Sequence, residues 1–293
     1  DARSWKKYLA TGGTLSRDDW RRENVNTLVR QLNEQIHATK PWVKFGISPF
    51  GIWRPGYPEQ VKGFDAYEQL YADSKLWWEK NWVDYFTPQL YWQISRPEQP
   101  FATLMRWWGA QNTTPRHLWI GLFTSRARAA TEAGNGLQSS NAWSTEEILA
   151  QVDSIRAYSR ASGEAHFSMK AFLNDQGNVG TRLLEGAYAE PALVPASPWL
   201  SKKPLSTPKV RVVKHAKTGG LSVAASLSKS EVARWYLVQT RTGGVWHSRL
   251  VVPSTHTEEI APDSAGLLPD RLVVTALDRA GVASPAVLLR ILP

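Results

Sequence analysis

The stretch of residues 44–54, KFGISPFGIWR, ends an apolar run with two side chains that could hold a ligand. Trp53 and Arg54 follow a turn rich in proline and glycine, which carries them beyond the end of a predicted strand. An exposed indole can stack on the apolar side of a sugar ring, and a guanidinium can pair with a carboxylate. The alternative is structural: Trp53 closes the rim of the domain and Arg54 faces solvent.

Residues 83–92, VDYFTPQLYW, show the same pattern of an apolar run followed by side chains that could bind a ligand. Here an amide and a phenol lie at the C-terminal end of the predicted strand. Gln89 and Tyr91 could hold a ligand or steady developing charge by hydrogen bonding. Since alternate residues of a strand face the same side, these two share a face, and Trp92 points the other way unless the strand has ended. Tyr91 and Trp92 could equally be packing residues. We take all three as candidate binding residues.

Helix and strand patterns alternate through the first two hundred residues. Ser16-Arg-Asp-Asp19 has the spacing of a capping box, and the apolar periodicity that follows predicts a helix over 17–39. Ser144-Thr-Glu-Glu147 predicts a second helix start in the same way. The predicted strands cover residues 43–48, 83–91, 117–123 and 165–172, and the other predicted helices cover residues 73–80, 97–111 and 179–189.

This alternation predicts a parallel sheet with helices outside it, because parallel strands need crossover connections and both faces must be covered. Four strands are half the number in a (β/α)8 barrel. Residues 1–200 are therefore predicted to form half of a TIM barrel. A small doubly wound sheet is the alternative, although no glycine-rich phosphate fingerprint follows any predicted strand.

The composition changes after residue 200. Only two of the 15 tryptophans lie beyond this point, where short runs of Val, Leu, Ser and Thr are separated by turn residues. Such spacing is typical of an all-β sandwich of the immunoglobulin or fibronectin kind. We predict a linker over residues 201–208 and a sandwich over 209–293, whose segment 272–285 resembles the last hairpin of fibronectin type III-like modules. Its expected role is that of a spacer or a contact module.

Several kinds of chemistry find no support in the sequence. Without cysteine there is no thiol nucleophile and no thiolate metal site, and the six histidines show no ligand spacing, so we expect neither a metal nor another cofactor. No Gly-x-Ser-x-Gly elbow accompanies Ser48 or Ser168, which argues against acyl-enzyme chemistry. The net charge of +9 is spread over both halves, and without a basic cluster or known motif we expect no nucleic-acid partner. No apolar run is long enough to span a bilayer, and no secretory leader opens the sequence.

Four motifs occur together and in one order, at residues 19–26 (DWRRENVN), 45–54 (FGISPFGIWR), 69–73 (QLYAD) and 88–92 (PQLYW). They resemble the glycosyl-hydrolase-like lipoproteins of bacterial envelopes, the YddW/YngK type, over most of residues 1–200. The resemblance implies a TIM-barrel glycosidase domain, exported and usually lipid-anchored, that acts on peptidoglycan glycan strands. In that family the segment matching residues 19–26 follows the fourth barrel strand. The resemblance thus implies that this chain holds the C-terminal half of the barrel, without the first four strands, the leader and the lipidated cysteine.

Glycosidases typically hold two carboxylates about 5 to 9 Å apart across the scissile bond, or one acid that works with a substrate acetamido group. Acids are scarce at the predicted strand ends, where barrel active sites lie. Asp84 is near the start of its strand, whereas Asp175 follows the strand predicted over 165–172. Asp175 is therefore the candidate catalytic residue, although the segment 174–177, NDQG, is also an ordinary turn. We expect the principal acid upstream of Asp1.

Arg21 and Arg22 fall in the first turns of the helix predicted over 17–39, where cations oppose the helix dipole. This unfavourable placement indicates that the two arginines bind an acidic partner. We favour an internal ion pair with acids of the missing strands over a contact with a substrate carboxylate.

We therefore expect a glycoside hydrolase of peptidoglycan, with Trp53, Gln89, Tyr91 and Trp92 along its groove. Arg54 is a further candidate binding residue, which could pair with a carboxylate such as the lactyl group of N-acetylmuramic acid. The alternative is a non-catalytic carbohydrate-binding or envelope-scaffold protein. The full-length protein is expected in the periplasm or at the outer membrane, held there only by a missing N-terminal lipid. Alone, these 293 residues are expected to be inactive and poorly soluble as a monomer, since a half-barrel leaves strand edges open.

Overall fold

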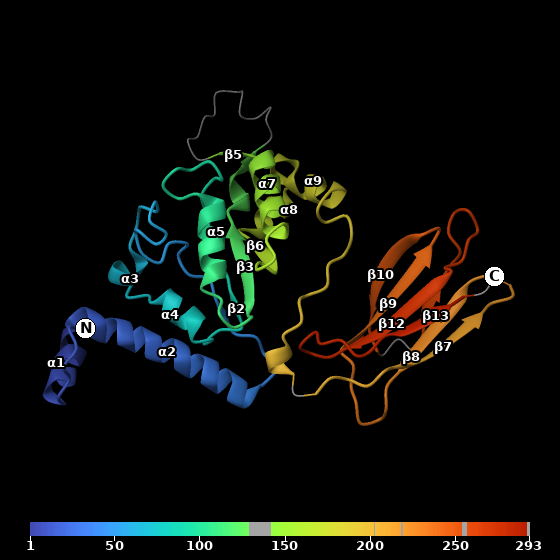
Figure 1. Ribbon diagram of the computed structural model, residues 1–293, viewed down its shortest axis with the longest axis horizontal. Coiled ribbons are helices and arrows are strands. Elements are labelled where there is room, and N and C mark those ends of the chain that lie inside the picture. The colour runs from blue at the N-terminus through green and yellow to red at the C-terminus, as the bar shows by residue number, and fades with distance from the viewer. Residues whose placement is uncertain (129–141, 202, 218, 254–256, 292–293) are drawn as a thin grey trace. The chain divides into compact units, whose positions relative to one another are not determined.

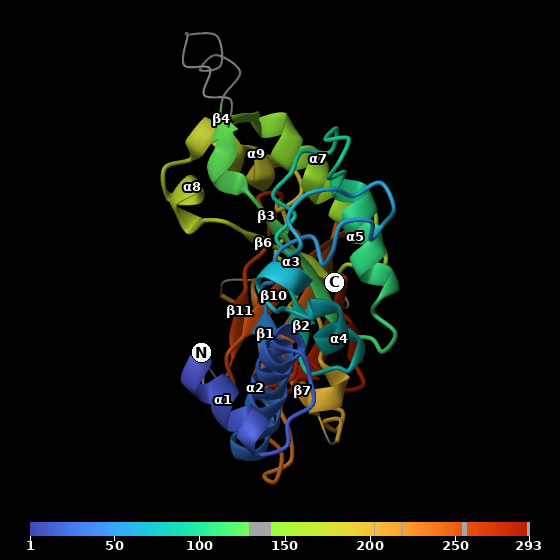
Figure 2. The same ribbon diagram turned by 90° about the vertical axis from the view of Figure 1, so that its left-hand side faces the viewer.

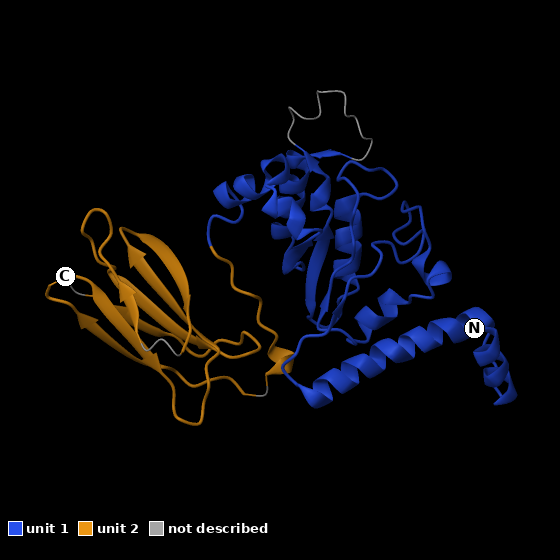
Figure 3. Ribbon diagram, turned by 180° about the vertical axis from the view of Figure 1, so that it is seen from behind, with its two compact units in different colours: residues 1–190 blue, residues 191–293 orange. Residues whose placement is uncertain are grey.

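The computed structural model describes residues 1–128, 142–201, 203–217, 219–253 and 257–291. The chain forms two compact units, residues 1–190 and 191–293 (Figure 3). The division falls before the segment predicted as a linker, because the residues around 197–201 pack on the second unit. The Ser197 amide donates a hydrogen bond to the Ala280 carbonyl (2.8 Å), and the Ser201 hydroxyl donates one to the Asp278 carboxylate.

The first unit is built on a parallel sheet, in which strands β1 (Gly46–Ile47), β2 (Tyr85–Phe86), β3 (His117–Leu122) and β6 (Gly163–His166) lie side by side in that order (Figure 1). The predicted alternation of helices and parallel strands is confirmed. β2 is shorter than the strand predicted over 83–91, because Pro88 interrupts the ladder, but a bridge at Gln89 resumes the pairing.

Helix α2 (Arg17–Thr39) begins as predicted, with the Ser16 side chain accepting a hydrogen bond from the Asp19 amide. Helix α7 (Thr145–Arg156) begins in the same way, with Ser144 accepting one from the Glu147 amide. Helices α4 (Ser74–Glu79), α5 (Phe101–Ala110) and α9 (Val179–Glu185) lie within the ranges predicted for them. Figure 2 shows α2 at the opposite end of the unit from α7, α8 (Met169–Leu173) and α9.

The strand predicted over 165–172 is wrong beyond His166, where β6 ends. Residues Met169–Leu173 form helix α8 instead. The sequence MKAFL contains Met, Lys, Ala and Leu, which all have high helix propensity, and that local preference prevails once pairing with β3 stops at Leu122. Asp175 therefore follows a helix, not a strand.

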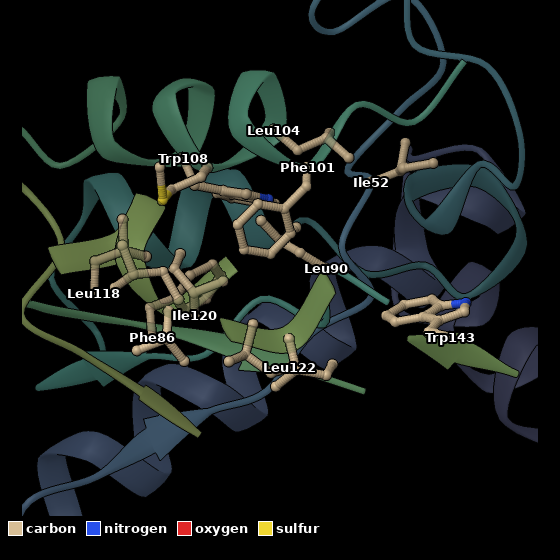
Figure 4. Packing of buried hydrophobic residues seen from close by; sticks show 14 of the residues in the cluster. Ile52, Phe86, Leu90, Phe101, Leu104, Trp108, Leu118, Ile120, Leu122 and Trp143 are labelled. Carbon is tan, nitrogen blue, oxygen red and sulfur yellow. The ribbon is translucent and has the colours of Figure 1, made fainter. Parts of the chain in front are cut away.

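The core of the first unit lies between the sheet and the helices α5, α7 and α9. Figure 4 shows Phe101, Leu104 and Trp108 of α5 above the strand residues Leu118 and Ile120. All five side chains have no exposed surface. Burial of each side chain contributes about 1.5–3 kcal/mol to the stability of the fold. This packing determines which face of the sheet the helices cover, and the alternate residues of each strand point to the other face.

The second unit consists of two antiparallel sheets. One has the order β10 (Val245–Val251), β9 (Trp235–Thr242), β12 (Arg271–Leu277), β13 (Val287–Arg290), and the other has the order β11 (Glu258–Ile260), β8 (Leu221–Ser226), β7 (Lys209–Lys214). Val223 of β8 shares one buried cluster with Val238 and Val274 of the larger sheet. The residues that enter this core alternate along the strands, as Leu272, Val274 and Ala276 do in β12.

The remaining elements are short or peripheral: α1 (Ala2–Ala10), α3 (Ala66–Gln69), β4 (Ala127–Arg128), β5 (Trp143–Ser144) and the 3-10 turns η1 (Thr124–Arg126), η2 (Gln176–Asn178) and η3 (Pro198–Leu200). Among the described helices, none has the length and apolar character needed to cross a membrane.

Candidate functional site

The outgoing ends of β1, β2 and β3 meet in one row, formed by Phe50, Gln89 and Gly121. Two glycines allow this close approach. A Cβ at Gly51 would lie 2.3 Å from the Gln89 carbonyl oxygen, and one at Gly121 would lie 3.0 Å from the Pro88 carbonyl oxygen. The strand that contains Gln89 thus leaves no room for a side chain at Gly51 in the SPFG turn. The turn lies at the carboxyl edge of the sheet, where parallel α/β folds bind ligands.

Gln89 is held in place by Ser48 at this edge. Its side-chain amide donates hydrogen bonds to the Ser48 carbonyl (3.1 Å) and hydroxyl (3.2 Å), and the Ser48 hydroxyl donates to the Thr87 carbonyl (2.9 Å). These contacts use the amide nitrogen of Gln89 and fix its direction, so that its carbonyl oxygen is the group available to accept from a ligand.

Tyr91 lies in an aromatic group with Phe123 and Phe167, the residues that follow β3 and β6. Its ring centroid is 4.9 Å from that of Phe123 and 5.9 Å from that of Phe167. Phe167 is 52% exposed, so the group reaches the surface. Burial raises the pKa of the Tyr91 phenol, which therefore stays protonated at neutral pH. Within the described parts of the chain this phenol has no hydrogen-bond partner, which leaves it free to bind a ligand.

Trp92 packs away from this group, against the buried cluster of the first unit. Its ring meets Phe50 edge-on at 5.6 Å, and its carbonyl accepts a hydrogen bond from the Gln151 side chain (3.0 Å). Glu147 supports the same loop by accepting from the Ile94 amide (2.7 Å). The contacts of Trp92 are those of a packing residue that anchors the loop after β2.

Trp53 and Arg54 belong to a different group of side chains, centred on Tyr67. The guanidinium of Arg54 lies 4.5 Å from the Tyr67 ring centroid and pairs with Asp65 (3.3 Å) and Glu68 (2.8 Å). Trp53 meets the same tyrosine edge-on at 5.7 Å. Both predicted binding residues thus have partners within the unit, and Arg54 has two carboxylates where a substrate carboxylate was expected.

Arg22 completes this group from α2. It is only 5% exposed, lies 3.6 Å from the Tyr67 ring centroid and pairs with Asp19 and Glu68. The internal ion pair predicted for Arg22 is present, but its acids lie within this chain. Arg21 likewise pairs with Asp1 and Asp18.

Asp73 is an acid that the sequence did not single out, although it closes the motif at 69–73. It caps α4 by accepting from the Leu76 amide (3.3 Å), and it also accepts from the Trp53 indole (3.2 Å). Burial raises its pKa above the usual range, although these two hydrogen bonds act in the opposite direction. The capping pattern before α4 could have marked Asp73, but nothing in the sequence showed that it is partly buried beside Trp53.

Asp175 caps the start of α9. Its carboxylate accepts hydrogen bonds from the Gly180 amide (2.8 Å), the Thr181 amide (3.1 Å) and the Thr181 hydroxyl (2.6 Å). These bonds, above all those from Thr181, lower its pKa. A carboxyl held ionised suits a base or nucleophile, not a general acid, and all its hydrogen bonds serve the turn. The prediction of a catalytic Asp175 rested on the strand predicted over 165–172, which ends at His166.

A chain of polar groups that the sequence did not predict lies on the helix-covered side of β6. The Tyr188 hydroxyl donates to Glu164 (2.5 Å) and accepts from Nε2 of His166 (2.7 Å), whose Nδ1 faces the Thr124 hydroxyl (2.7 Å). Burial lowers the pKa of His166 to about 4. The neutral imidazole of His166 has one ring nitrogen that donates and one that accepts, as this series of hydrogen bonds requires. The series joins β6 to the segment after α9.

The described residues contain no group of three or more His, Cys, Asp or Glu side chains that could hold a metal ion. Within those same ranges, no carboxylate accepts a hydrogen bond from Ser48, Gln89 or Tyr91. The rim of the sheet offers an amide oxygen, a free phenol and exposed aromatic surface. Those groups are suited to binding a polyhydroxylated ring, and they do not include a proton donor of the glycosidase type.

Comparison with known proteins defines the class. Residues 1–137 match the family described as Glycosyl hydrolase-like 10. This match covers α1 to β4 and therefore all four motifs. The chain is related to the glycosyl hydrolase-like proteins, as the motifs predicted.

The relatives give the type within this class. The chain is 38% identical over 211 residues to Glycosyl hydrolase YngK of Bacillus subtilis, a match that covers 70% of this chain and 40% of that protein. It is 35% identical over 127 residues to Glycosyl hydrolase DigH of Escherichia coli K12, covering 42% of this chain and 28% of that protein. These matches support the predicted resemblance to the glycosyl hydrolase-like proteins of the YngK type. The chain spans less than half the length of both curated relatives.

Likeness to solved structures is weak. The glycoside hydrolase domain of Endo-D from Streptococcus pneumoniae R6 aligns with 31% of this chain and 15% of that chain, at 20% identity and a TM-score of 0.23.

Proposed function

We propose that this chain is part of a glycoside hydrolase that acts on the glycan strands of bacterial peptidoglycan. The relation to proteins named glycosyl hydrolases supports the reaction class. The free phenol of Tyr91, set among Phe123 and Phe167 beside the fixed amide of Gln89, is the observation that carries the binding role. Aromatic rings cover the apolar side of a sugar, while the phenol and amide bond its hydroxyl or acetamido groups.

The proposal treats the parallel sheet of the first unit as half of a TIM barrel. Its strands follow one another in chain order with helices between them, which is the arrangement of consecutive barrel strands. The exposed side chains of Phe167, Met169 and Leu173, which are 52%, 66% and 76% exposed, would then be covered by further strands of the full-length protein. By the same reasoning, the two sheets of the second unit form a fibronectin III-like sandwich.

The principal catalytic carboxylate is proposed to lie outside these residues. Asp175 is fully engaged in capping α9, and Asp73 is engaged by Trp53 and the start of α4. We therefore propose that the isolated chain does not cleave glycan. We further propose that the full-length protein works in the bacterial cell envelope.

The test uses the full-length protein that contains this chain, incubated with purified peptidoglycan glycan strands, with and without stem peptides. New reducing ends on either substrate are the expected result. If neither substrate yields reducing ends, the enzymatic proposal fails.

A second function, carbohydrate binding without turnover, is favoured by one observation: among the described residues, the rim of the sheet carries no carboxylate bonded to Ser48, Gln89 or Tyr91. Sedimentation with insoluble peptidoglycan separates the two functions when it is paired with the reducing-end assay. Retention without new reducing ends indicates binding alone, and loss of retention contradicts both functions.

A further inference from the structure

The outer face of the larger sheet in the second unit carries a row of one indole and three guanidinium groups. Strands β10, β9, β12 and β13 lie side by side in that order (Figure 1). Their register places Trp246 of β10 opposite Arg241 of β9, Arg241 opposite Arg271 of β12, and Arg271 opposite Arg290 of β13. Cross-strand partners project from the same face of a sheet. With strands about 4.8 Å apart, the row spans about 14 Å.

The face is distinct from the core of the unit. In β12, Leu272 and Val274 point inward and are buried, so the residues that alternate with them, Arg271 and Val273, point outward. Trp246 is 43% exposed, and Arg290 is exposed. The cationic row is therefore open to ligands from the solvent side of the second unit.

The charges of the row are not balanced within the described chain. Asp270 pairs with Arg241, whose guanidinium also lies 6.0 Å from the Trp246 ring centroid. Arg271 and Arg290 form no ion pair with any described residue, although the Asp270 carboxylate also attracts the Arg271 guanidinium. One carboxylate therefore stands beside three guanidinium groups. Like charges directly opposite each other on neighbouring strands repel, so the structure tolerates an unfavourable pair at Arg271 and Arg290. An anionic ligand relieves this repulsion.

The residues beside the row indicate that the anionic ligand is a sugar. The next row contains Ser248 and Gln239, whose side chains are joined by a hydrogen bond of 3.2 Å, and then Val273 and Leu288. Hydroxyl and amide groups bond sugar hydroxyls, while the Trp246 ring can stack on the apolar side of a pyranose. Three guanidinium groups beside one carboxylate are too few cations for tight binding to nucleic acid, whose affinity depends on many phosphate contacts.

We propose that this row, Trp246, Arg241, Arg271 and Arg290, binds a carboxylate-bearing polysaccharide, with Arg271 and Arg290 pairing with carboxylates and Trp246 stacking on a sugar ring. This site lies in the second unit and does not depend on hydrolysis by the first.

The test is calorimetric titration of the whole 293-residue chain with four chemically defined ligands. Oligogalacturonate offers both carboxylates and rings, chitohexaose offers rings alone, poly-L-glutamate offers carboxylates alone, and duplex DNA offers phosphates. We expect binding of oligogalacturonate to exceed that of the other three by at least about tenfold. Equal or tighter binding of poly-L-glutamate or DNA would show a general polyanion surface and overturn the proposal, as would tighter binding of chitohexaose.

Variants locate the site. The double substitution R271A/R290A is expected to weaken oligogalacturonate binding at least about tenfold. The matched control K209A/R211A removes the same charge from exposed residues of β7 in the other sheet and should leave binding unchanged. W246A should weaken binding and W246F should restore much of it. Equal loss in the control pair, or full binding by R271A/R290A in a chain with an unchanged unfolding transition, contradicts the proposed site.

Discussion

Both units place an indole near guanidinium groups, but the two arrangements differ in the acids around them. In the first unit, Arg54 and Arg22 lie over Tyr67 and pair with Asp65, Asp19 and Glu68. In the second unit, Trp246 is followed across the sheet by three arginines, and Asp270 pairs with the first of them, Arg241. The same residue types stabilise the fold where several carboxylates pair with them, and we propose that they bind a ligand where one carboxylate faces three guanidinium groups.

The largest effect is expected at Arg22, because it is nearly fully buried. We expect R22A to lower the free energy of unfolding by about 2 kcal/mol, since it removes the partner of two carboxylates and a cation–π contact. Urea denaturation monitors the change. R30A, an exposed residue of the same helix, is the control and should change stability by less than about 0.5 kcal/mol.

Arg54 offers a direct contrast with the second unit. R54A should cost about 1 kcal/mol of unfolding free energy through its lost ion pairs, without weakening oligogalacturonate binding. R271A/R290A should weaken that binding while stability stays within about 0.5 kcal/mol. If R54A weakens the binding and R271A/R290A lowers stability, the two clusters have been assigned the wrong way round.

Asp175 and Asp73 are expected to make stability depend on pH in opposite directions. Hydrogen bonds lower the pKa of Asp175 from 3.8, so its contribution to stability is present above this pKa and lost as the pH falls through the lowered value. Burial raises the pKa of Asp73 from 3.8, so its contribution is present below 3.8 and lost as the pH rises through the raised value.

Unfolding transitions of D175N and D73N, each measured against wild type from pH 2 to 6, check these signs. The stability that wild type has in excess of D175N should shrink on acidification, and its difference from D73N should change in the opposite direction. Parallel curves for the two variants would contradict the assigned environments.

The sequence predicted those features of the fold that depend on local signals. The capping pattern at Ser16 and the apolar periodicity located α2, and the alternation of runs located the parallel sheet. The strand predicted over 165–172 failed because apolar content alone does not distinguish the end of β6 from the start of α8.

The candidate site was less predictable, because it depends on contacts between distant segments. Gln89 and Tyr91 lie at the carboxyl edge of the sheet, where alternation along the strand placed them. Arg54 appeared available for a substrate, yet Asp65 and Glu68 reach it after a turn whose path the sequence does not specify. The Trp246 row was not predicted at all, since it exists only once four strands are in register.

The central claim is that the free phenol of Tyr91 binds glycan in a hydrolase. Its most direct test compares Y91F with wild type in the full-length protein, by kcat/KM for reducing-end release from peptidoglycan glycan strands. Y158F is the matched control, because the Tyr158 hydroxyl bonds the Arg106 carbonyl (3.4 Å) on the helix-covered side. We expect Y91F to lose about tenfold in kcat/KM and Y158F to retain the wild-type value. An active Y91F with unchanged kcat/KM would contradict the claim.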